Sequence, residues 1–70
     1  MGRAMFEYTK LILEKVSFNS ELFIQELENS LKRLLPFEIN ELQIWINNFV
    51  NEKPELKPSV LLIENKKKSL

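Results

Sequence analysis

The sequence contains no cysteine and no histidine, and each absence excludes a class of chemistry. Disulfides, thiolate zinc sites and imidazole metal sites are impossible, and the commonest general base is missing. A serine nucleophile with a lysine base is formally possible, but Ser17 and Ser20 are better explained as helix caps. Glu38 and Glu41 are three residues apart, yet the Glu-x-x-His pattern of di-metal bundles cannot occur. We therefore expect no enzyme, no metal, no cofactor and no small-molecule substrate.

Aspartate is also absent, so all ten acidic residues are glutamate, balanced by ten lysines and arginines to a net charge of zero. Glutamate forms helices better than aspartate, and the chain has only one glycine and three prolines, so the composition predicts helix. Seventy residues fit a single domain. A chain this short buries only about 60% of its unfolded surface. Without disulfides or metals, association with another chain is the support that remains available.

Long hydrophobic runs are missing too. The longest uninterrupted apolar run has four residues, 60–63, far short of the roughly 20 that span a bilayer. Glu7 and Lys10 break up the apolar residues near the N-terminus, where a secretory signal would need a continuous run. We expect a soluble, cytoplasmic protein with no membrane partner. Residues 1–4 precede a second methionine, Met5, and are expected to be an alternative start or a remnant of an expression vector.

Two segments in the first half of the chain have helical periodicity. Residues 3–16 carry apolar side chains at spacings of three and four, and residues 20–35 repeat this pattern more cleanly on one face. Asn19 is a suitable N-cap for the second helix, because its side-chain oxygen can accept from N–H groups of the next turn. Phe18 and Phe23 then occupy N′ and N4, the positions of a hydrophobic staple.

A third helix is predicted over residues 36–50. Pro36 suits its first position, and Glu38 lies near the positive end of the helix dipole. At about 100° per residue, six apolar residues form one continuous core-facing arc. They are Ile39, Leu42, Trp45, Ile46, Phe49 and Val50. Trp45 is expected to be buried against the first two helices.

The C-terminal segment is more ambiguous. Pro54 can open a single turn, but a long helix through Pro58 is disfavoured by proline stereochemistry. The apolar run 60–63 fits a short buried strand or a helical stub, with a slight preference for the extended form. The predicted fold is therefore all-α, a small three-helix bundle over residues 5–53. A proline-containing tail, 54–70, follows it, with a solvated, frayed basic end.

Phe37 and Ile44 are aligned with each other but lie off the core arc of the third helix. One interpretation is that the first helix or the 60–63 segment covers them, and the other is that they form an interface. The candidate interface residues are Phe37, Ile44, Val60, Leu61, Leu62 and Ile63. The function expected from this surplus of apolar residues is a non-catalytic helical protein-interaction module that self-associates or docks on a protein partner.

Nucleic-acid binding is the alternative function. The third helix would be the recognition helix of a helix-turn-helix, but it has no arginine or lysine between Pro36 and Val50. The basic residues gather instead at Lys66, Lys67 and Lys68. The alternative is thus a small nucleic-acid-associated regulator that uses its basic C-terminal tail, and it predicts duplex binding that weakens steeply with salt.

Overall fold

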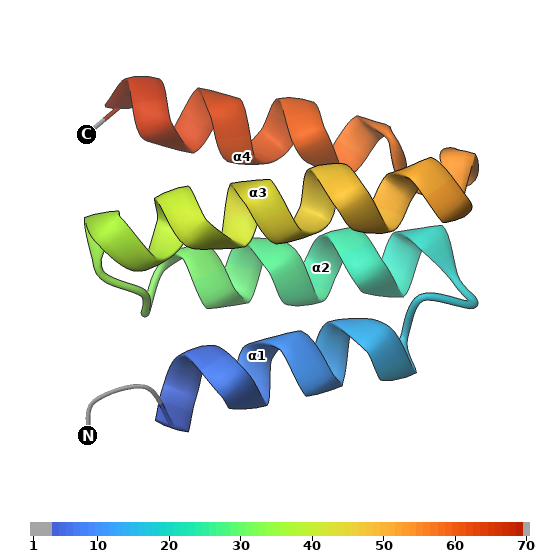
Figure 1. Ribbon diagram of the computed structural model, residues 1–70, viewed down its shortest axis with the longest axis horizontal. Helices are drawn as coiled ribbons and strands as arrows, with labels where there is room; N and C mark the ends of the chain where they lie inside the picture. The colour runs from blue at the N-terminus through green and yellow to red at the C-terminus, as the bar shows by residue number, and fades with distance from the viewer. Residues whose placement is uncertain (1–3, 70) are drawn as a thin grey trace.

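Four α-helices and one 3₁₀ turn make up the computed structural model, which describes residues 4–69. The elements are α1 (Ala4–Lys15), α2 (Ser20–Leu31), α3 (Pro36–Glu52), η1 (Pro54–Leu56) and α4 (Pro58–Ser69). Successive helices alternate in direction, so α1 begins and α4 ends at the same end of the bundle (Figure 1). No strand occurs within residues 4–69, and the all-α prediction is confirmed.

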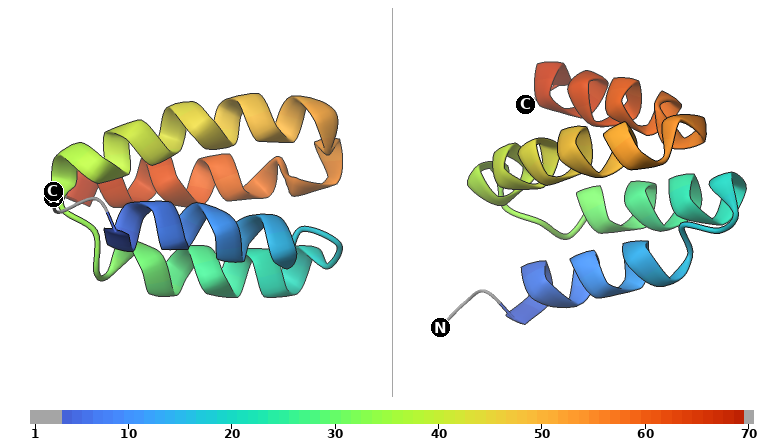
Figure 2. Two further views of the ribbon diagram at one scale, coloured as in Figure 1. Left: turned by 60° about the horizontal axis from the view of Figure 1, so that its bottom comes forward. Right: turned by 45° about the vertical axis from the view of Figure 1, so that its right-hand side comes forward.

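Two further views show the arrangement of the four helices (Figure 2), and their buried apolar residues form one core. α4 packs most extensively on α3 and also on α2, while α1 packs on α2. The buried apolar residues come from every element. They are Phe6, Leu13, Phe23, Leu27, Leu31, Leu34, Ile39, Leu42, Ile46, Val50, Leu56 and Ile63.

The prediction of three helices followed by a tail is not confirmed, because residues 58–69 form the fourth helix. Pro58 begins this helix, at a position where a missing backbone donor costs nothing, so it starts the helix rather than breaking one. Leu56 and Ile63 are completely buried with residues of α2 and α3. The slight preference for an extended segment over a helical stub at residues 60–63 is therefore wrong. The frayed basic end is wrong too, since Lys66, Lys67 and Lys68 lie in the last turn of α4. Pro54 opens the short turn η1, as predicted.

The connection between α2 and α3 is longer than the sequence indicates. α2 ends at Leu31, and residues 32–35 lead to α3. Leu35 is extended, with ψ 158°, because Pro36 disfavours the helical conformation in the residue before it. Its backbone N–H donates to the buried Glu38 carboxylate at 2.9 Å. This contact closes the first turn of α3 and gives Glu38 the N-terminal role that the sequence predicts.

An aromatic stack links α2 to α3. The ring centroids of Trp45 and Phe49 lie 4.9 Å apart, and those of Phe23 and Phe49 lie 5.9 Å apart, both in stacked geometry. Phe23 is completely buried, whereas Trp45 and Phe49 are only partly buried against the core. The predicted burial of Trp45 is therefore confirmed only in part.

Asn19 caps α2 as predicted. Its Oδ1 accepts from the backbone N–H of Glu21 at 2.9 Å and of Leu22 at 3.2 Å. The hydrophobic staple is wrong, because Phe18 is 78% exposed while Phe23 is fully buried, so the two do not bury each other.

Replacing Asn19 with alanine should lower the free energy of unfolding by about 1 kcal/mol, because two donors at the start of α2 lose their acceptor. Urea denaturation followed by circular dichroism measures the loss. Asn29→Ala is the matched control, since Asn29 is exposed within α2 and alanine is the better helix former there. An equal stability loss in both variants would contradict the role of the cap.

Candidate functional site

A groove lies between α3 and α4, which we call the α3–α4 groove. It is open to solvent, has a volume of about 650 Å³, and has a mainly apolar accessible lining. The residues that line it are Asn47, Asn48, Val50, Asn51, Lys57, Pro58, Val60, Leu61 and Glu64. Because α3 and α4 run antiparallel and pack closely, these two stretches lie side by side.

Burial differs sharply among the apolar residues of the groove. Val50 is buried and Val60 is partly buried, both packed with the core, so they form the floor. Leu61 is 65% exposed and stands on the α4 side of the groove. An apolar floor with a projecting leucine beside it is a typical feature of protein-binding surfaces.

Ile44 extends this surface along α3. It precedes Asn47 and Asn48 by three and four residues, so it lies one turn away on the same helix face. Its side chain is 64% exposed. The groove and Ile44 together form a face with apolar residues on both helices.

Polar residues mark the two ends of the groove. Lys57 lines one end, where α4 begins, and Glu64 lines the other, two helical turns along the chain. Seven residues at 1.5 Å per residue separate these positions by about 10 Å along the helix axis. Lys57 precedes the first residue of α4, but its backbone angles are helical, with φ −54° and ψ −35°. The spacing of seven residues, nearly two complete turns, therefore places both side chains on the same side.

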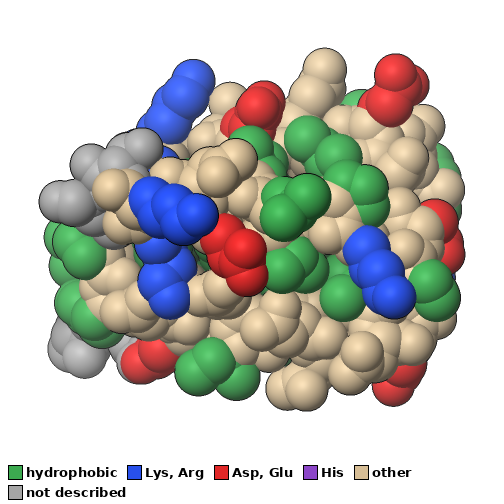
Figure 3. Space-filling model, turned by 90° about the horizontal axis from the view of Figure 1, so that it is seen from above, with side chains coloured by type: hydrophobic (Ala, Val, Ile, Leu, Met, Phe, Trp, Pro, Cys, Tyr) green, Lys and Arg blue, Asp and Glu red, His purple; other side chains and the backbone are tan. Residues whose placement is uncertain are grey.

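The Glu64 end also carries hydrogen bonds that join α3 to α4. Lys67 Nζ donates to Gln43 Oε1 at 2.5 Å, and Gln43 Nε2 donates to Glu64 Oε2 at 3.5 Å. These side chains are solvent-exposed in part, so the bonds contribute little to stability but fix where the charges lie. Figure 3 shows the molecule from the α4 side: hydrophobic side chains gather over its middle, several basic side chains lie towards the end that bears the C-terminus, and a further basic side chain lies towards the opposite end.

The predicted interface residues divide into three groups. Phe37, Ile44 and Leu61 are exposed, with Phe37 52% exposed. Val60 and Leu62 are partly buried against the core, and Ile63 is completely buried within it. Only Val60 and Leu61 line the groove, and Phe37 lies about two turns beyond Ile44 on α3. The expectation that the first helix or the 60–63 segment covers Phe37 and Ile44 is wrong, since both are exposed.

The polar residues of the site are not among those predicted from the sequence. The three asparagines of α3 and the pair Lys57 and Glu64 line the groove, yet none was singled out. A signal does exist in the sequence, because asparagines at 47, 48 and 51 share one helix face. These asparagines lie beside the apolar floor only because residues 58–69 form a helix antiparallel to α3, and the sequence does not predict that helix.

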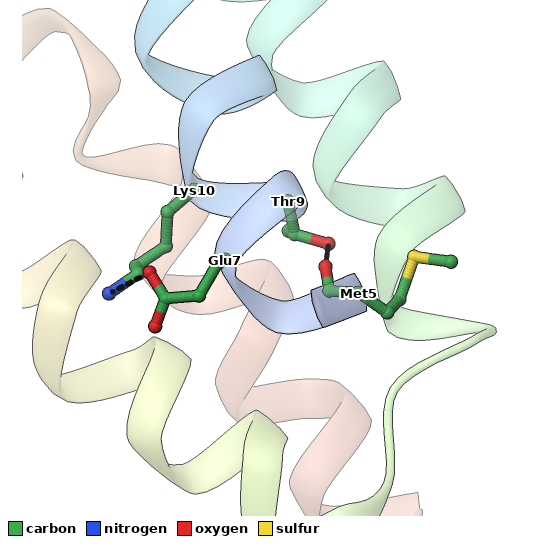
Figure 4. A network of polar contacts seen from close by, with 4 residues as sticks. All are labelled: Met5, Glu7, Thr9 and Lys10. Atoms are coloured by element: carbon green, nitrogen blue, oxygen red, sulfur yellow. Dashed lines mark hydrogen bonds and ion pairs between the residues drawn. The ribbon is translucent and has the colours of Figure 1, made fainter. Parts of the chain in front are cut away.

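Outside the groove, the polar side chains of α1 interact with residues of the same helix. In α1, Thr9 Oγ1 donates to the Met5 carbonyl at 2.8 Å, and Lys10 Nζ lies 3.3 Å from Glu7 Oε1 (Figure 4). The same lysine lies 5.0 Å from the centre of the Phe6 ring. These contacts are local to one helix and bring no groups together from different elements.

The other buried hydroxyls are bound in the same local way. Ser17, Ser30 and Ser59 each donate to a backbone carbonyl three or four residues earlier. Within residues 4–69, no buried side-chain nitrogen or oxygen lacks a partner, and no group of three or more acidic residues is placed to hold a metal ion. None of the helices in this range has the length and apolar character needed to cross a bilayer.

The basic residues lie mainly at the end of the bundle where α2 and α4 terminate. Lys66, Lys67 and Lys68 occupy the last turn of α4, where they oppose the partial negative charge of the helix end. Lys32, just after α2, lines a shallow hollow with Lys66, and Glu28 lines it too. The lysines therefore have a structural role at the helix terminus and share their surface with an acidic side chain.

By its fold and surface, this is a small all-α protein with an apolar groove between antiparallel helices. No protein-family model, no curated protein and no solved structure matches the chain.

Proposed function

We propose that the protein is a non-catalytic protein-interaction module that binds through the α3–α4 groove and self-associates there. The observation that carries the proposal is the exposed Leu61 in the apolar lining of the groove, with exposed Ile44 one turn away along α3. Single exposed apolar residues are normal on a small protein, but their clustering at a concave surface is characteristic of interfaces. Burial of that surface also supplies the extra stability that a 70-residue chain without disulfides needs.

Other exposed apolar residues support the proposal less well. Phe18 and Leu22 lie where α1 joins α2, and Tyr8 and Leu11 lie on α1. Leu22 and Tyr8 each line a separate hollow, and both hollows have mixed polar and apolar linings. The α3–α4 groove has the more apolar lining and is therefore the better candidate for the binding surface.

Nucleic-acid binding through the basic end is the weaker proposal. α3 has no lysine or arginine, and the three lysines of α4 oppose the dipole of their own helix. Lys67 also donates to Gln43, and Glu28 lies at the same hollow as Lys32 and Lys66. A phosphate-binding surface is normally a basic patch without interspersed carboxylates.

Sedimentation velocity at micromolar concentration tests the proposal. The wild-type protein should sediment as an oligomer, and Leu61→Glu should weaken its association about thirtyfold or more, because a charge replaces a leucine at the centre of the interface. Ile44→Glu, at the margin of the same face, should have a smaller effect in the same direction. Since both residues are exposed, circular dichroism should show unchanged folding.

Leu11→Glu is the matched control, because Leu11 is 56% exposed on α1, away from the groove. It should sediment like the wild-type protein. A wild-type chain that stays monomeric and folded would contradict self-association. An oligomer that resists both Leu61→Glu and Ile44→Glu would move the interface away from the groove.

A further inference from the structure

The charge pattern of the groove identifies the partner more closely. We propose that a second copy of this chain occupies the groove in an antiparallel, two-fold arrangement, with α4 packed against α4 of the other copy near Val60 and Leu61. This inference rests on the proposed function and adds the geometry of the dimer. It follows from the positions of the two charged residues that end the groove.

Lys57 and Glu64 lie almost symmetrically about the midpoint between Val60 and Leu61. A two-fold axis through that midpoint exchanges position 57 with position 64. Each Lys57 then faces Glu64 of the other copy, and the dimer contains two opposite-charge pairs at the rim. A parallel arrangement would instead place lysine against lysine and glutamate against glutamate, which is unfavourable.

The apolar residues satisfy the same symmetry. The two-fold axis places Leu61 of one copy beside Val60 of the other, so the projecting leucine of each copy meets the apolar floor of its partner. An interface of this kind uses the same patch twice and must be complementary to itself. Residues 57–64, from Lys57 just before α4 to Glu64 within it, meet that requirement with opposite charges at the two ends and apolar residues between them.

The α3 side of the groove is also compatible with a second copy. Asn47, Asn48 and Asn51 are exposed and line the groove. Each side-chain amide has both a donor and an acceptor group, so identical asparagines can bond to one another across a two-fold axis. Residues of like charge at these positions would instead repel the same residues of the second copy. The groove is therefore lined with groups that tolerate self-pairing.

Charge reversal provides the test. Lys57→Glu places glutamates opposite each other at both rim contacts, and Glu64→Lys places lysines opposite each other. Each variant alone should dimerise about tenfold more weakly than the wild-type protein, because two exposed attractive pairs become repulsive. Lys57 and Glu64 are exposed, so both variants should keep the wild-type circular dichroism spectrum.

The two variants should rescue each other when mixed. One copy then carries glutamate at both 57 and 64 and the other carries lysine at both, so every rim contact is again an opposite pair. Sedimentation of the equimolar mixture should show heterodimers of about wild-type affinity. The double variant Lys57→Glu/Glu64→Lys should recover self-association by itself, and all differences should shrink at high salt.

Glu14→Lys and Lys15→Glu are the controls, because both residues are exposed on α1, on the opposite side of the bundle from α4 (Figure 1). Neither variant should change dimer affinity by more than about twofold. If the wild-type protein dimerises and Leu61→Glu abolishes this, but mixing gives no rescue, the two-fold geometry is wrong while the binding surface stands. If Leu61→Glu has no effect on a wild-type dimer, or the wild-type protein is monomeric, the proposed function itself fails.

Discussion

Phe23→Ala should lower the free energy of unfolding by about 3–5 kcal/mol, the range observed when a large aromatic side chain is deleted from a packed core. Phe23 is completely buried in α2 and its ring stacks on that of Phe49 in α3, with centroids 5.9 Å apart. Its removal leaves a cavity and breaks the contact that joins the two helices. At about 0.05–0.15 kcal/mol per residue, that loss is a large part of the stability available to this chain.

Urea denaturation followed by Trp45 fluorescence measures the effect. Trp45 stacks on Phe49, so its emission reports on the same aromatic cluster. Phe18→Ala is the matched control, because the same substitution is made five residues away at a side chain that is 78% exposed. It should change the free energy of unfolding by less than about 0.5 kcal/mol. Similar losses in the two variants would show that the core is not packed around Phe23.

The core side of α3 could be predicted from the sequence because its apolar residues recur with the helical period. Ile39, Leu42, Ile46 and Val50 all lie on the predicted arc, and all are buried. Trp45 lies at the edge of that arc, where a large ring extends beyond the enclosed volume, so its burial is only partial. The period of the apolar residues thus predicts which face of the helix is buried, but it does not predict how wide that buried face is.

α4 could not be predicted from the same signal. Its four apolar residues are consecutive, so they point in all directions around a helix and give no period. Packing alone decides that Ile63 enters the core while Leu61 is exposed. Pro58 was interpreted as a helix breaker, although it begins α4 just as Pro36 begins α3. A proline breaks a helix only where an α-helix would run through it. The residues before Pro58 form the short 3₁₀ turn η1 and not an α-helix, so Pro58 interrupts none.

The sequence predicts only part of the candidate binding surface, because the rest depends on the helical structure of α4. Ile44 and Leu61 were identified because exposed apolar residues are detectable from helical arcs and apolar runs. Lys57 and Glu64 were not, because their relation to the groove depends on α4 being helical from Pro58 onward. Once the helix is known, the spacing of seven residues places both charges on one side of it.

The role of α4 in the core leads to the second large effect. A chain ending after Lys53 should fail to fold, because the segment removed contributes Leu56 and Ile63, both completely buried. Burying two such side chains contributes about 3–6 kcal/mol. The deletion also uncovers core residues of α3 such as Val50, since α4 packs more extensively on α3 than on any other element. Together these losses match or exceed the stability expected of a 70-residue protein.

Circular dichroism and urea denaturation of the shortened chain test this expectation, which opposes the sequence-based boundary of a three-helix domain at residue 53. The chain ending at Lys53 should show weak helicity and no cooperative unfolding transition. The variant Lys67→Ala/Lys68→Ala of the full chain is the control, because both side chains are exposed. It should unfold cooperatively with nearly wild-type stability. A cooperative transition in the chain ending at Lys53 would show instead that α1, α2 and α3 fold independently and that α4 is an accessory to their core.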